Sequence, residues 1–170
     1  MNQRAYLITG IAGSGKSTLC REFEKLGVVA LDIDKGFAHW VNRETGETAP
    51  YSTDEPMIVH HDWLANAEKM QRAIDQENVP VWFFGSAHNL HTFQGMFKHV
   101  FLLSYANEDA IRHRILTRAE NDYGKAPGEL DGIIGYWKNY EQNFENMGTT
   151  VIDCTLPVEK IIEKIREVAS

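Results

Sequence analysis

Five short apolar runs, each separated from the next by a longer segment, constrain the fold of this chain more than any other feature. The runs that we expect to be strands are residues 5–9, 28–33, 81–84, 100–105 and 149–154. Strands that are apolar throughout and alternate with helices are typical of a parallel sheet covered on both faces. The sequence therefore predicts an α/β fold, a three-layer sandwich with a five-stranded parallel sheet. Its 170 residues suit one domain, residues 1–170.

The segments between the runs mostly have the apolar spacing of helices. Helices are expected at 16–26, 63–77, 107–120 and 132–146, and a last helix is expected to open at Pro157. Residues 35–58 show neither periodicity and are expected to be irregular. Ligands of such sheets bind at the carboxyl ends of the strands, so the residues after each strand are the site candidates.

Composition narrows the possible partners and location. The formal net charge of −7 argues against general binding to a nucleic-acid backbone, which relies on basic surface. No apolar run approaches the roughly 18 residues of a membrane span. The chain starts directly on an apparent strand, which leaves no room for a signal peptide, so its two cysteines are expected to be reduced. These features predict a cytoplasmic protein with a small-molecule partner, either a monomer or a homodimer.

The most specific motif is the stretch GIAGSGKST, residues 10–18. It matches G-x-x-x-x-G-K-[ST] and lies between an expected strand and an expected helix, which is the context the motif requires. Glycines let successive N–H groups turn toward phosphate oxygens, and the helix adds its positive N-terminus. Lys16 supplies a charge for the β- and γ-phosphates, and the Ser17 hydroxyl is placed to bind Mg²⁺. The predicted nucleotide-binding residues in this loop are Gly10, Ala12, Gly13, Ser14, Gly15, Lys16, Ser17 and Thr18.

Two carboxylates mark the end of the second expected strand. Asp32 and Asp34 are two residues apart, and side chains with that spacing face the same side of an extended chain. One can hold Mg²⁺ and the other can accept a proton from an attacking hydroxyl. We therefore expect both to point into one cleft beside the phosphate loop.

Features that the sequence lacks favour transfer of phosphate to a bound acceptor over hydrolysis. The guanine-reading Asn-Lys-x-Asp motif of phosphate-loop GTPases does not occur. The third expected strand, in VWFFGSAHN, ends without the acidic residue that large ATPases use for Mg²⁺ and water. The sequence therefore lacks the residues that these enzymes use to activate water.

A cluster of arginines precedes a polar, glycine-containing segment. Arg114 and Arg118 are four residues apart on one expected helix, with Arg112 nearby. The segment at about 119–131 carries Lys125 and has the composition of a lid. A kinase needs such a lid, because cations must clamp the transferring phosphoryl group and water must be excluded.

These motifs together resemble the small phosphate-loop kinases, the group of shikimate, gluconate and nucleoside monophosphate kinases. GIAGSGKST, LDID, RILTR and DCTLPVEKII follow in the same order and at similar spacing as in shikimate kinase. The resemblance implies the adenylate/shikimate kinase-like P-loop fold. It also implies that Arg114 stacks on adenine, that Arg118 contacts phosphate, and that the loop of Thr155, Leu156 and Pro157 cradles adenine. Asp32 would be linked to the metal, and Asp34 would bind the acceptor.

Two departures from the family bear on the acceptor. Shikimate kinases end the third strand in a triple glycine, whereas this chain has Gly85-Ser86-Ala87. The Asp-Gly-x-Pro-Arg sequence of nucleoside monophosphate kinases is absent, and arginines between 35 and 95 are limited to Arg43 and Arg72. A phosphorylated acceptor usually needs several cations, so the region at about 34–78 looks poorly suited to one.

The acceptor region is instead rich in rings, which can stack on a base or pack in the core. Trp40 and Arg43 are the preferred acceptor contacts, since they directly follow the carboxylate pair. His88 can also hydrogen-bond the acceptor, whereas a metal site at His88 and His91 is disfavoured. The predicted acceptor-binding set is Asp34, Trp40, Arg43, Gly85, Ser86, Asn89 and Lys125.

We therefore expect an ATP- and Mg²⁺-dependent kinase that phosphorylates a hydroxyl of a polyol, a sugar acid or a nucleoside. Lys16, Asp34 and Arg118 are its predicted catalytic residues, Arg114 and Pro157 further contacts to ATP, and Ser17 and Asp32 the metal ligands. A nucleoside monophosphate kinase, a regulatory module that binds nucleotide without turnover and a 5′-hydroxyl polynucleotide kinase remain the alternatives.

Overall fold

The computed structural model of the protein describes residues 4–52, 57–119, 121–145 and 147–170. Its main sheet has five strands, β1 (Ala5–Thr9), β2 (Val29–Asp32), β6 (Val81–Phe84), β7 (Phe97–Ser104) and β8 (Thr150–Asp153). All of them are parallel, in the order β2-β6-β1-β7-β8. The predicted α/β fold with five parallel strands is therefore confirmed.

Helices cover the main sheet because their apolar stripes face it. They are α1 (Lys16–Lys25), α3 (Ala67–Asp75), α4 (Glu108–Thr117), α5 (Glu129–Glu145) and α6 (Val158–Ala169). Phe23 of α1 contacts Trp82 and Phe84 of β6, with ring centroids 5.1 and 5.2 Å apart. From α5, Trp137, Tyr140 and Phe144 are buried in the same core. This packing fixes the helices relative to the carboxyl ends of the strands.

A second, antiparallel sheet occupies part of the region that we expected to be irregular. It consists of β3 (Ala38–Asn42), β4 (Thr48–Ala49) and β5 (His61–Ala65) in the order β4-β3-β5, and the short helix α2 (Met57–His60) precedes β5. The prediction of an irregular segment over 35–58 is therefore wrong at 38–42, 48–49 and 57–58, whereas 53–56 lie outside the described residues. Strands β3 and β5 are separated by a long connection, and each stabilises the other only when they pair, so local spacing carried no sign of them.

The helix predicted at 63–77 is also corrected. Trp63 and Leu64 belong to β5, where they pair with Trp40 and His39. The helix α3 begins at Ala67 because the Asn66 side chain caps it, accepting a hydrogen bond from the Lys69 backbone N–H at 2.9 Å. Leu64 fits both a helical stripe and an alternating strand, and tertiary pairing decided between them.

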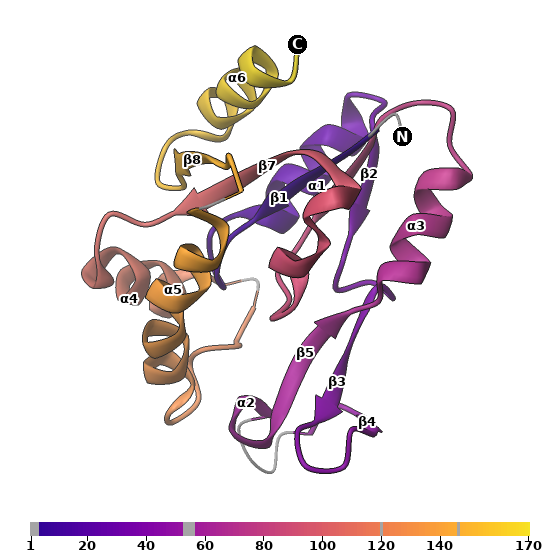
Figure 1. Ribbon diagram of the computed structural model, residues 1–170. Helices are drawn as coiled ribbons and strands as arrows, with labels where there is room; N and C mark the ends of the chain where they lie inside the picture. Colours follow the sequence, from indigo (N-terminus) through magenta and orange to yellow (C-terminus); the bar gives the residue numbers. More distant parts are fainter. Residues whose placement is uncertain (1–3, 53–56, 120, 146) are drawn as a thin grey trace.

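The arrangement of the two sheets prepares a site at one end of the molecule. Figure 1 shows the antiparallel sheet extending below the main sheet, at the end toward which its strands point, with α4 and α5 to one side. The remaining element is η1 (Leu90–Met96), which links the residues after β6 to β7. No helix among the described residues is both long and apolar enough to cross a membrane.

Candidate active site

The phosphate loop connects β1 to α1 and borders a cavity of about 990 Å³. Gly13 and Gly15 have φ angles of 81° and 93°, in the left-handed region that favours glycine. Gly10 is required by a close approach instead, since a Cβ there would lie 2.4 Å from the Leu103 carbonyl oxygen. Of the predicted loop residues, Ala12, Gly13, Gly15, Lys16, Ser17 and Thr18 line the cavity, whereas Gly10 and Ser14 are buried and are not among the described residues that line it.

Lys16 opens α1, and its ammonium group is bound within the loop. Nζ donates to the carbonyl oxygens of Gly10 at 2.7 Å and Ile11 at 2.8 Å, and to Ser14 Oγ at 3.3 Å. Burial lowers the pKa of Lys16 to about 8, although the negative charge of Asp34 opposes that shift. The predicted contact of Lys16 with the β- and γ-phosphates stays a prediction.

Asp34 faces the cavity, but Asp32 does not lie among the described residues that line it. Strand β2 ends at Asp32 and residues 33–37 form a turn, so the extended geometry from which we expected both carboxylates to face one cleft does not reach Asp34. Asp32 Oδ1 accepts the Asp34 N–H at 3.1 Å, and Trp63 Nε1 donates to Asp34 Oδ1 at 3.1 Å. Burial raises the pKa of Asp34, an effect that the nearby charge of Lys16 opposes. The metal role of Asp32 stays a prediction.

Arg114 and Arg118 both line the cavity, where α4 ends. The carbonyl oxygens of Asn121, at 3.1 Å, and Tyr123 accept hydrogen bonds from the Arg118 guanidinium. A Cβ on Gly13 would lie 3.6 Å from Arg118 Nη1, so this guanidinium lies against the phosphate loop. The carbonyl oxygens of Asn121 and Tyr123 therefore hold Arg118 against the phosphate loop.

The other wall of the cavity consists largely of rings. Trp40 and Trp63 are cross-strand partners on β3 and β5, and their ring centroids are 5.2 Å apart. The sequence analysis preferred Trp40 as an acceptor contact, and the structure places both tryptophans on the cavity. The remaining lining residues on this side are Tyr51, Ile58, Ser86, Ala87, His88, Ile133, Tyr136 and Tyr140.

Several predicted site residues make structural contacts and are not among the described residues that line the cavity. Asn89 binds both the N–H and the carbonyl of Ala65, at 2.8 and 2.9 Å, and so anchors β5 to the main sheet. Lys125 donates to the Arg118 carbonyl oxygen and to Asp122. Pro157 is the N-cap residue of α6. Their acceptor or ATP contacts remain predictions that this arrangement does not support.

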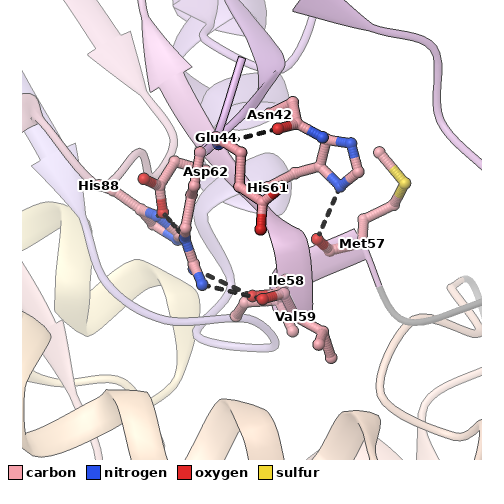
Figure 2. A network of polar contacts seen from close by, with 9 residues as sticks. Asn42, Glu44, Met57, Ile58, Val59, His61, Asp62 and His88 are labelled. Atoms are coloured by element: carbon pink, nitrogen blue, oxygen red, sulfur yellow. Dashed lines mark hydrogen bonds and ion pairs between the residues drawn. The ribbon is translucent and has the colours of Figure 1, made fainter. Parts of the chain in front are cut away.

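Arg43 contributes to a polar network behind the ring-lined wall. Its Nε donates to Asp62 Oδ1 at 3.0 Å, and its two terminal nitrogens donate to the carbonyl oxygens of Val59 and Ile58, each at 3.0 Å. The same carboxylate oxygen lies 2.8 Å from His88 Nδ1, and Figure 2 shows Asp62 and His88 turned toward one another. Arg43 therefore holds Asp62, and Asp62 in turn holds His88.

The sequence analysis missed Asp62 and Tyr136. Asp62 comes from the strand β5 that we had not expected, so no local signal could pair it with His88, which is 26 residues away. Tyr136 was within reach of sequence reasoning, because Tyr136 and Tyr140 are one helical turn apart on the expected helix 132–146. The structure places Tyr136 and Tyr140 on the cavity.

With this geometry established, comparison with known proteins identifies the family. The sequence matches the profile of the AAA domain over residues 7–135, more than half of the chain. The chain belongs to the AAA domain family. None of the curated proteins compared with it matches.

Solved structures similar to this AAA domain confirm the resemblance to small phosphate-loop kinases. Shikimate kinase from Bacteroides thetaiotaomicron has a TM-score of 0.58 and 16% identity, covering 97% of each chain. Gluconokinase from Sinorhizobium meliloti 1021 has a TM-score of 0.54 and 14% identity, covering 95% of this chain and 89% of that chain. Deoxyadenosine kinase from M. mycoides, with bound dATP, has a TM-score of 0.58 and 18% identity, covering 98% of this chain and 100% of that chain. At these identities the likeness concerns the fold.

Gly85 of this AAA domain has a packing role that gives a testable expectation. A Cβ at this position would lie 2.5 Å from the Ile33 Cβ, closer than side chains pack. Gly85→Ala should therefore lower the free energy of unfolding by about 1–3 kcal/mol, as overpacking does. Gly135→Ala in α5, where a Cβ would meet no described atom within 4 Å, should instead raise it by about 0.5–1 kcal/mol. Urea unfolding of the two variants checks both, and equal stabilities would contradict the close approach.

Proposed function

We propose that the protein is an ATP- and Mg²⁺-dependent kinase that transfers the γ-phosphoryl group to a hydroxyl of a small-molecule acceptor. One observation carries the proposal: Lys16, Ser17, Arg118 and Asp34 line the same cavity as the ring-rich wall. Nucleotide phosphates and an acceptor would therefore meet between a cationic end and a carboxylate. The structures similar to this chain support the same reaction class, since those named above are all kinases.

Each polar residue has a defined part in such a transfer. The backbone N–H groups of the phosphate loop and the start of α1 bind the β- and γ-phosphates. Lys16 and Arg118 offset negative charge as the bond between the γ-phosphorus and the bridging oxygen breaks and ADP departs. Asp34 accepts the proton of the acceptor hydroxyl whose oxygen forms the new bond to phosphorus.

The residues present fit a magnesium ion that arrives with the nucleotide. Ser17 and Asp34 both line the cavity, and their side chains offer oxygen ligands of the kind Mg²⁺ prefers. Among the described residues no group of three or more histidine, cysteine or acidic side chains could hold a metal by itself. Mg²⁺ would therefore be bound jointly with phosphate oxygens, and when bound it would neutralise part of their charge.

The test is acceptor-dependent release of ADP. A panel of polyols, sugar acids, nucleosides and nucleoside monophosphates is offered with Mg²⁺ and ATP, and a non-hydrolysable ATP analogue is followed by thermal shift. We expect the analogue to raise the melting temperature and at least one acceptor class to release ADP. Binding of the analogue without ADP release from any class would favour a regulatory module.

The pH dependence of kcat/KM should report two groups of the free enzyme. Burial raises the pKa of Asp34, so activity should fall with decreasing pH at a value above the ordinary one near ~4 for aspartate. Burial lowers the pKa of Lys16 to about 8, so activity should also fall with increasing pH from that value, as its charge is lost. Asp34→Asn should remove the acidic limb and keep the alkaline one. A profile flat across both ranges would contradict these assignments.

A further inference from the structure

We infer that the acceptor of this kinase is an uncharged alcohol that carries a flat ring, of the nucleoside class, and that His88 orients it by hydrogen bonding. The inference rests on the proposed function and deepens it. Three observations support it: the charges of the residues that line the cavity, the shape of its ring-lined wall, and the unpartnered hydroxyl of Tyr136.

The positive charge of the cavity is concentrated at its phosphate end. Among the described residues that line it, the lysines and arginines are Lys16, Arg21, Arg114 and Arg118. All four belong to α1, to α4 or to the residue that caps α4. The elements of the ring-lined wall contribute Asp34 and no lysine or arginine from the described residues. The residues that the structure does not describe carry no lysine, arginine or histidine in the sequence either.

Arg43 does not fill this deficit, although it directly follows β3, the strand that carries Trp40. Its guanidinium is bound by Asp62 and by the carbonyl oxygens of Ile58 and Val59, three contacts that hold it behind the wall. An acceptor with a carboxylate or a phosphate would therefore place its charge near Asp34 without a counter-ion. Burying an unpaired charge in this way is strongly unfavourable, so the wall selects against such acceptors.

The shape of the wall suits a flat ring. Trp63 is held by its hydrogen bond to Asp34, and its ring is tilted 53° to that of Trp40. Further rings line the same cavity: the ring centroids of His88 and Tyr136 are 4.8 Å apart, and those of Tyr136 and Tyr140 are 5.2 Å apart. Aromatic faces of this kind stack on any planar base.

His88 and Tyr136 offer the hydrogen bonds that such a ring or its sugar would use. Partial burial raises the pKa of Asp62, but the hydrogen bonds from His88 and Arg43 outweigh it and the pKa is lowered. Asp62 is therefore ionised, so His88 donates through Nδ1 and its Nε2 remains for a molecule in the cavity. The Tyr136 hydroxyl is buried and has no hydrogen-bond partner in the described part of the chain. Tyr136 lines the cavity, and a buried polar atom without a partner calls for an explanation such as a polar atom of a bound molecule.

The first experiment measures ADP release with Mg²⁺ and ATP for the common ribonucleosides and deoxynucleosides, their 5′-monophosphates, shikimate, gluconate and myo-inositol. We expect the highest kcat/KM for a nucleoside, at least about tenfold above its own monophosphate, as the charge argument requires. A carboxylate, a monophosphate or inositol at or above the best nucleoside would overturn the inference and leave the proposed function standing. Absence of ADP release with every acceptor, despite binding of the ATP analogue, would overturn both.

The second experiment separates recognition from stability. Tyr136→Phe removes only the unpartnered hydroxyl, so the urea unfolding midpoint should be equal or higher while KM for the nucleoside rises about fivefold or more. His88→Ala should raise the same KM about tenfold, His88→Gln should restore part of it, and KM for ATP should stay within about twofold. His113→Gln, an exposed substitution on α4 outside the lining set, is the matched control. Equal changes in both KM values, or no change in Tyr136→Phe, would show that these residues are structural.

Discussion

Lys16→Ala is expected to lower kcat for phosphoryl transfer by about 10²–10³ or more while the protein remains folded. The ammonium group is the cation in the phosphate loop itself, and alanine cannot contact the β- and γ-phosphates. In the fold it binds the carbonyl oxygens of Gly10 and Ile11, which the variant leaves without that donor. The variant also removes a partly buried charge, so the two effects on stability oppose each other and the unfolding midpoint should change little.

Lys25→Ala is the matched control for this variant. Lys25 lies on the same helix, but its side chain is 70% exposed and pairs with Glu22. Such a surface pair contributes little to stability, so the control should keep the activity and the unfolding midpoint of the parent protein. Thermal unfolding with and without ATP distinguishes loss of phosphate binding from loss of the fold. A fully active Lys16→Ala protein would remove the basis of the proposed function.

Asp34→Asn is expected to lower kcat by about 10²–10⁴, with the affinity for ATP within about twofold of the parent value. Asparagine has nearly the same shape, and its side-chain oxygen still accepts the hydrogen bond from Trp63 Nε1, so the ring-lined wall should keep its arrangement. What the variant loses is the capacity to take a proton from the acceptor hydroxyl. Single-turnover rates and equilibrium binding of an ATP analogue measure the two effects separately.

Two further aspartates serve as references for Asp34→Asn. Asp75→Asn on α3 keeps its oxygen for Gln71 and lies outside the described lining residues, so it should be indistinguishable from the parent protein. Asp32→Asn tests the predicted metal role, and a shift in the Mg²⁺ concentration needed for half-maximal activity would support it. Equal losses of turnover and ATP affinity in Asp34→Asn would contradict its role as a base.

The sequence by itself determined the parts of this protein that local chemistry encodes. The run AYLIT followed by GIAGSGKST specifies a buried strand, a glycine-rich turn and a helix within a few residues, so the loop and its cavity residues followed directly. The other four apolar runs predicted the parallel sheet in the same way, although the fourth strand begins at Phe97 rather than at 100. The shared position of Arg114 and Arg118 could also be predicted from the sequence, because residues four apart on a helix lie on one face.

Tertiary structure alone decided what surrounds the acceptor side of the cavity. Trp40 meets Trp63, Arg43 turns to Asp62, and Asp62 holds His88, although these partners are 19 to 26 residues apart in the sequence. Trp40 lies on β3, Asp62 and Trp63 lie on β5, and these two segments gain stability only together, so neither carries a strong signal alone. The phosphate end of the cavity can therefore be predicted from one continuous stretch of residues, whereas the acceptor end forms only when strands distant in the sequence pair.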